Sequence, residues 1–147
     1  MKIWVDADAC PKAIKDILVR AAERTGIHTA FIANQWMTLP LSDTVSFEQV
    51  GSGLDVADDK IADECNSEDL VITADIPLAL RAVNKGALAL DPRGTLYDSN
   101  NIGQISDMRN FMSELREDGV QTGGPKPFSQ RDTLAFANAL NKILTKA

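Results

Sequence analysis

Four aspartates stand directly after apolar runs of the sequence: Asp6, Asp8, Asp75 and Asp91. The apolar runs before them predict buried strands. In an open parallel sheet, ligands bind beyond the carboxyl ends of the strands, so we expect these four side chains to gather along one edge. Carboxylates in such a cluster repel one another unless a cation or a shared proton stabilises them.

A helix predicted from about Asp55 to Cys65 brings further carboxylates to the same edge. On a helical projection, Asp58 lies at the border of the apolar face and Asp59 points further toward solvent. Asp55 stands at the helix start, where an N-cap role is equally open. Sites rich in carboxylate oxygen favour Mg²⁺ or Mn²⁺ over zinc, and such ions assist the hydrolysis of phosphodiesters.

Few other side chains could carry chemistry. The chain has one histidine, His28, and two isolated cysteines, Cys10 and Cys65. Zinc fingers, disulfide frameworks and most Ser-His or Cys-His catalysis are thereby excluded. We expect Cys10 to be a buried structural thiol and His28 to be a surface residue, so catalysis would depend on carboxylates.

The elements that position these acids alternate between strands and helices. Strands are predicted at 3–5, 29–33, 44–50, 70–73 and 87–90, and helices at 11–25, 55–65, 77–84, 102–117 and 130–146. This order implies crossover units and a mostly parallel sheet. We predict one α/β domain over residues 1–147, whose last part, about 99–147, adds a C-terminal helical pair.

The composition is that of a globular protein, with 147 residues and a net charge of −6. Residues 1–98 hold 16 acidic against 9 basic side chains, whereas residues 99–147 hold 5 against 6. No window is long and apolar enough for a transmembrane helix, and the first residues leave no room for a signal peptide. We therefore expect a cytoplasmic protein with no membrane association.

Helix capping is the structural alternative for three of the acids. Asp8 precedes Pro11, Asp55 precedes its own helix, and Asp75 precedes Pro77. Aspartate is a favoured N-cap residue. For each of these residues, capping and ligand binding both remain open at this point.

The motifs that contain these acids resemble those of the YaiI/YqxD family of bacterial proteins. The resemblance rests on Val5-Asp6-Ala7-Asp8-Ala9-Cys10-Pro11, on Gly53-Leu54-Asp55-Val56-Ala57-Asp58-Asp59, on Val71-Ile72-Thr73-Ala74-Asp75-Ile76-Pro77-Leu78-Ala79, on Leu90-Asp91-Pro92-Arg93-Gly94 and on Gly123-Gly124-Pro125. That family is similar to PIN-like and NYN nucleases. The resemblance implies a PIN-like three-layer sandwich and Mg²⁺- or Mn²⁺-dependent cleavage of RNA.

The resemblance also implies roles for individual residues. Catalytic roles would belong to Asp6, Asp58 and Asp75, and metal ligation to Asp6, Asp8, Asp55, Asp59 and Asp75. Thr73 would contact substrate beside Asp75. The sequence departs from the PIN pattern in having Asp instead of the commoner Glu on the helix, and in its C-terminal helices.

Basic side chains near the site would offset the repulsion between the acids and RNA phosphates. Arg93, directly after Asp91, is the first candidate for a phosphate contact, and Arg109 and Arg131 are further ones. Helix-surface ion pairs are the alternative role for such residues. The loop at residues 123–125 could shape a substrate site or simply connect two helices.

Two other functions compete with the nuclease hypothesis. A non-catalytic PIN-like domain would bind RNA or protein without turnover. Asp6-x-Asp8 also resembles the first motif of haloacid-dehalogenase-type phosphatases, in which Asp6 would be the nucleophile. Asp58 and Asp59 precede Thr73 in the chain, however, whereas the paired acids of that family should follow it.

A second copy of the chain is a further candidate partner. Trp36 and Met37 lie in an apolar loop with Leu39-Pro40-Leu41. This loop could form a dimer patch or pack onto the core.

Overall fold

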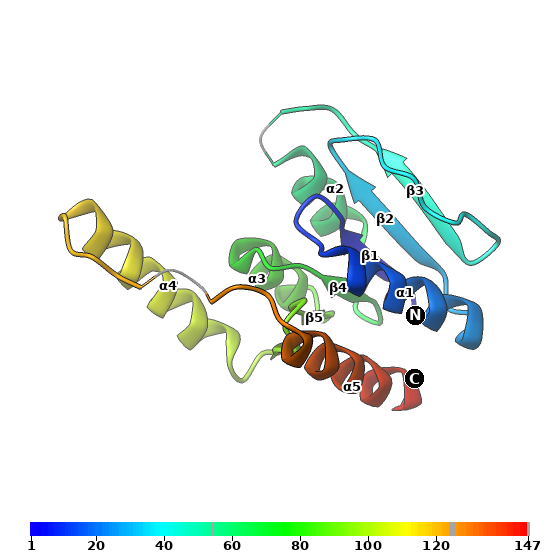
Figure 1. Ribbon diagram of the computed structural model, residues 1–147. Coiled ribbons are helices and arrows are strands. Elements are labelled where there is room, and N and C mark those ends of the chain that lie inside the picture. The colour runs from blue at the N-terminus through cyan, green and yellow to red at the C-terminus, as the bar shows by residue number, and fades with distance from the viewer. Residues whose placement is uncertain (54, 124–125, 147) are drawn as a thin grey trace.

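The computed structural model describes residues 1–53, 55–123 and 126–146, so the motif residues Leu54, Gly124 and Pro125 lie outside the described residues. It forms a three-layer α/β arrangement with a central sheet and helices on both faces (Figure 1). The six strands follow the order β3-β2-β1-β4-β5-β6. They are β1 (Ile3–Asp6), β2 (Thr29–Ala33), β3 (Val45–Gln49), β4 (Leu70–Ile72), β5 (Leu88–Leu90) and β6 (Leu96–Tyr97).

The first five strands are parallel, as the alternation of strands and helices predicts, and β6 pairs antiparallel to β5. The sequence analysis missed β6, because a two-residue strand after the turn at Asp91 to Gly94 carries no periodic pattern. The helices are α1 (Lys12–Thr25), α2 (Val56–Glu64), α3 (Ile76–Asn84), α4 (Ile102–Glu117) and α5 (Gln130–Lys146). Among the described residues, no helix is long and apolar enough to cross a bilayer.

Alternate residues of the strands supply the two cores. Ile3 and Val5 of β1 point to the face covered by α1 and α5. Trp4, between them, points to the face covered by α2, α3 and the start of α4. This alternation is the period-two geometry of a strand buried on both faces.

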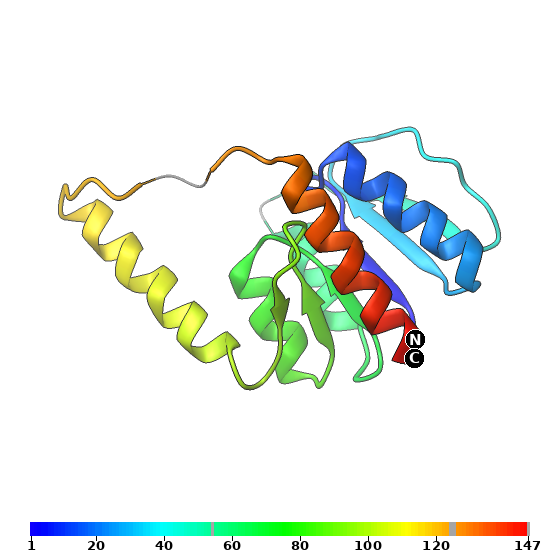
Figure 2. The same ribbon diagram turned by 60° about the horizontal axis from the view of Figure 1, so that its bottom comes forward.

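The predicted C-terminal helical pair is divided between the two faces of the sheet. α4 packs on α3 through Ile102, whereas α5 packs beside α1 through Phe136 and Leu140 (Figure 2). Because each helix has its own apolar anchor on a different face, the two cannot pack on each other along their length.

The apolar loop after β2 divides between core and solvent. Met37 and Leu39 pack against the core beside α1. Trp36 and Leu41 are 69% and 62% exposed. Core packing is thus confirmed for the first two residues only.

Candidate functional site: an acidic edge of the sheet

Five aspartates line two adjoining hollows at the carboxyl ends of the strands. A hollow of about 170 Å³ includes Asp6 and Asp8, and one of about 320 Å³ includes Asp75; Asp55 and Asp58 line both. We call these residues, Asp6, Asp8, Asp55, Asp58 and Asp75, the acidic edge. They come from β1, the loop after it, the start of α2 and the loop after β4.

Asp6 is the most deeply placed member of the acidic edge. It ends β1 between β2 and β4 and is only 9% exposed. Its Oδ2 accepts a hydrogen bond from Thr73 Oγ1 at 3.0 Å. Burial raises the pKa of Asp6, the Thr73 bond partly offsets this, and the charges of Asp75 and Asp8 add to the rise.

Thr73 connects Asp6 to Asp75. Its hydroxyl donates to Asp6 and accepts from the backbone N–H of Asp75 at 3.0 Å. Thr73 is itself 1% exposed. The predicted substrate residue therefore positions two members of the acidic edge and has no open face toward a ligand.

Asp58 lies on the first turn of α2, half-buried, where the helix meets β1. Burial, and then the charges of Asp6, Asp75, Asp55 and Asp59, raise its pKa from 3.8 to about 6. Burial is the largest cause of this rise, and repulsion by the neighbouring acids adds to it. Raised pKa values of this kind are frequent at functional sites and also occur in structural charge clusters.

The capping alternative is confirmed for Asp75 only. Asp75 Oδ1 accepts from Leu78 N at 3.0 Å and caps α3. Asp8 instead accepts from Asn34 N at 2.8 Å and from Gln35 N, and so fixes the loop after β2.

Asp55 occupies the N-cap position of α2 without a side-chain capping bond. Its backbone has a φ of +64°, in the left-handed region that a non-glycine residue seldom adopts. Asp55 is exposed and lines both hollows.

Two predicted acids are engaged elsewhere. Asp59 forms an exposed ion pair with Arg81 at 2.7 Å and lines neither hollow. Asp91 is predicted at the same edge, but both of its carboxylate oxygens accept hydrogen bonds within its own turn. Oδ1 accepts from the backbone N–H of Arg93, and Oδ2 accepts from the Tyr97 hydroxyl at 3.4 Å. Asp91 thus stabilises the β5–β6 turn.

The predicted basic residues occupy three different environments. Arg109 of α4 lines the larger acidic hollow, together with Arg81 of α3. Arg93 donates to Asp132 Oδ2 at 2.9 Å and to the carbonyl of Lys126, and it stacks over Phe128. Arg131 is exposed at the start of α5. Of these three predicted residues, the structure brings only Arg109 to the acids.

The sequence analysis did not predict two residues that line the site, Asn34 and Arg81. Asn34 lines the smaller hollow with Asp6 and Asp8, and its buried Oδ1 has no hydrogen-bond partner. It directly follows β2, so the strand-end rule that selected the aspartates could have found it. Arg81 reaches the site from the last turn of α3, where no sequence motif marks it.

Cys10 and His28 take no part in the acidic edge. Burial raises the pKa of the Cys10 thiol to about 12, which agrees with the predicted structural role. His28 is half-buried, with Nε2 3.0 Å from Ser46 Oγ.

The fold and the site together define a mixed α/β protein with an acidic cluster at the carboxyl edge of a mostly parallel sheet. The chain belongs to the uncharacterised YaiI/YqxD family, whose model matches residues 4–146. The family resemblance of the motifs is thereby confirmed.

Relatives cover nearly the whole chain. It is similar to a UPF0178 protein of Shewanella sp. (strain MR-7), with 55% identity over 99% of this chain and 95% of the relative. A UPF0178 protein of Marinomonas sp. (strain MWYL1) is 53% identical, over 99% and 98%. A UPF0178 protein of Vibrio cholerae serotype O1 is 52% identical, over 99% of this chain and 98% of the relative. No solved structure matches the chain.

Proposed function

We propose that the acidic edge binds Mg²⁺ or Mn²⁺ and that the protein is a metal-dependent ribonuclease of PIN-like type. The observation that carries this proposal is the gathering of five carboxylates around two adjoining hollows, where burial, and then repulsion by the neighbouring acids, raises the pKa of Asp58 to about 6. A divalent cation would relieve this repulsion and stabilise the ionised carboxylates.

The donor set fits such an ion in chemistry. Five carboxylates and the unpartnered Oδ1 of Asn34 are hard oxygen ligands, and no histidine or cysteine lines the two hollows. Within the described residues, no three acidic, histidine or cysteine side chains already stand close enough to hold a metal. Binding therefore requires side-chain rotation. Asp55, which is exposed and makes no side-chain capping bond, is free to rotate, whereas Asp8 would first release the backbone N–H groups of Asn34 and Gln35.

Each acid has a distinct environment for its role. Asp6 is fixed by Thr73, and Asp75 uses one oxygen for capping and keeps the other for a ligand. A bound Mg²⁺ or Mn²⁺ supplies activation of water and stabilisation of charge on the phosphoryl group. Asp58, with a pKa close to neutrality, suits the acceptance of a proton from water.

Arg109 gives the site a phosphate contact. It lines the larger hollow beside Asp75 and Asp58, where a guanidinium would pair with a phosphate oxygen of the substrate. A substrate with a backbone of phosphates, such as RNA, would approach from the side of α4.

The test is cleavage of a labelled single-stranded RNA with Mn²⁺ by the wild type, by Asp6→Asn and by Asp75→Asn. Asn caps a helix about as well as Asp, so the second variant removes charge and keeps α3 intact. We expect each variant to lose at least about a hundredfold in rate. Asp16→Asn, an exposed change on α1, is the matched control. Unchanged cleavage by either site variant would contradict the assignment.

A second candidate is a domain that binds RNA without cleaving it. The observation in its favour is that the described acids need to move before they can hold a metal. Calorimetry with Mn²⁺ separates the two: a nuclease needs the metal to bind at or below millimolar concentration. RNA binding without metal binding and without cleavage would favour the second candidate.

A further inference from the structure

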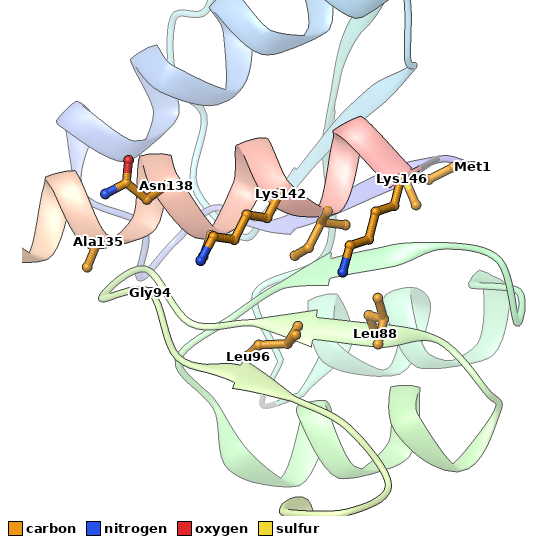
Figure 3. A pocket seen from close by; sticks show the side chains of 10 residues that line it. Met1, Leu88, Gly94, Leu96, Ala135, Asn138, Lys142 and Lys146 are labelled. Carbon is orange, nitrogen blue, oxygen red and sulfur yellow. The ribbon is translucent and has the colours of Figure 1, made fainter.

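A second, larger hollow lies on the other side of the sheet from α3 and shares no residue with the acidic edge. It has a volume of about 590 Å³ and lies between α5 and the strands β5 and β6 (Figure 3). Leu88 and Leu96 form its floor, and Ala139 and Ile143 form its α5 wall. Pockets of this size hold small organic ligands.

The position of α5 explains why this space is open. Of the described helices, α1 and α5 cover this face of the six-stranded sheet, together with loop residues such as Met37 and Phe128, and α5 packs beside α1. The floor residues Leu88 and Leu96 therefore stay half-buried.

One end of the hollow is closed by a tight contact. Gly94 has a φ of +96°, and a Cβ at this position would lie 2.8 Å from the Ala135 backbone. The β5–β6 turn thus lies directly against α5 at that end.

The rim of the hollow is basic. Lys142 and Lys146 stand one turn apart on α5, and both ammonium groups project over the leucine floor (Figure 3). In the part of the chain that the structure describes, neither lysine forms an ion pair. Among the described residues that line the hollow, none is acidic.

We propose that this hollow binds a small amphipathic carboxylate, with its alkyl chain on Leu88, Leu96 and Ile143 and its carboxylate between Lys142 and Lys146. The apolar floor requires a hydrocarbon part, since burial of apolar area drives its binding. The two ammonium groups require an anionic end, because charge-assisted hydrogen bonds are stronger than neutral ones. This site is independent of the proposed nuclease activity.

The experiment is a titration of the ¹⁵N-labelled protein with octanoate, octylammonium and acetate, followed through backbone amide NMR shifts. Octanoate should shift the amides of Leu88, Leu96 and Ile143, with a Kd at or below about 1 mM. Octylammonium carries the wrong charge and acetate lacks the chain, so both should bind at least about tenfold more weakly.

The double variant Lys142→Gln/Lys146→Gln separates the site from general charge attraction. Both lysines are exposed, so the fold should be kept. Octanoate should bind this variant about tenfold more weakly. Lys12→Gln, an exposed lysine on α1, should bind like the wild type. Equal binding of acetate or octylammonium, unchanged binding by the double variant, or shifts confined to other residues would each overturn the proposal.

Discussion

Replacing Asp58 by Asn should stabilise the protein at neutral pH. The folded state raises the pKa of Asp58 from 3.8 to about 6 through burial and four neighbouring charges. At about 1.36 kcal/mol per pKa unit, this shift corresponds to about 3 kcal/mol. Since the side chain is only half-buried, solvent screening reduces the cost to about 1–2 kcal/mol. The isosteric amide removes that cost together with the charge.

The sign of the pH dependence follows from the raised pKa. Between pH 3.8 and about 6 the folded state holds the Asp58 proton more tightly than the unfolded state does. The free energy of unfolding contributed by this group is therefore largest below pH 3.8 and is lost as the pH rises through 6. Asp58→Asn should match the wild type near pH 3.5 and exceed it by about 1–2 kcal/mol at pH 8.

Urea unfolding followed by the fluorescence of Trp4, which is buried in the core, measures the difference at both pH values. Asp59→Asn is the matched control, since its exposed pair with Arg81 contributes at most about 1 kcal/mol. This control should lower stability slightly at pH 8. If Asp58→Asn shows no gain at pH 8, or the same gain at pH 3.5, the proposed repulsion within the acidic edge is refuted.

Three further predictions concern the supports of the site. Thr73→Val removes the hydroxyl that donates to Asp6, so the pKa of Asp6 should rise further and urea unfolding at pH 7 should show a loss of about 1–3 kcal/mol. Arg93→Ala and Asp132→Asn break the same ion pair, so each should lower the free energy of unfolding by up to about 1 kcal/mol. If Arg93→Ala weakens RNA binding and Asp132→Asn does not, Arg93 contacts the substrate. Cys10, whose pKa is raised to about 12, should react with iodoacetamide at pH 8 only as fast as the protein unfolds, as peptide mass spectrometry would show.

The parallel part of the fold could be predicted from the sequence because its signals are local. Apolar runs such as Leu70 to Ile72 and helix boundaries such as Pro11 and Gly26 depend on neighbouring residues. The antiparallel β6 and the separation of α4 from α5 depend on packing between distant segments. No pattern within α4 indicates that Ile102 belongs to the core on the α3 side.

The sequence predicts which residues of the candidate site stand at the ends of strands. It does not predict the direction in which each side chain points. The strand-end rule places Asp6, Asp75 and Asp91 at one edge. It cannot show that the Asp91 oxygens are used by the turn that leads to β6. Nor can it show that Arg93 faces Asp132, since that contact joins residues 39 positions apart.

Asp75 shows why capping and ligand binding are not exclusive interpretations of one aspartate. A carboxylate has two oxygens, and the cap on Leu78 uses only Oδ1. The charge that remains still raises the pKa of Asp6 and of Asp58. Asp75 alone therefore both caps the start of α3 and places a charged oxygen at the larger hollow. Sequence reasoning about such positions should therefore count the free oxygen atoms of each acid instead of choosing between two roles.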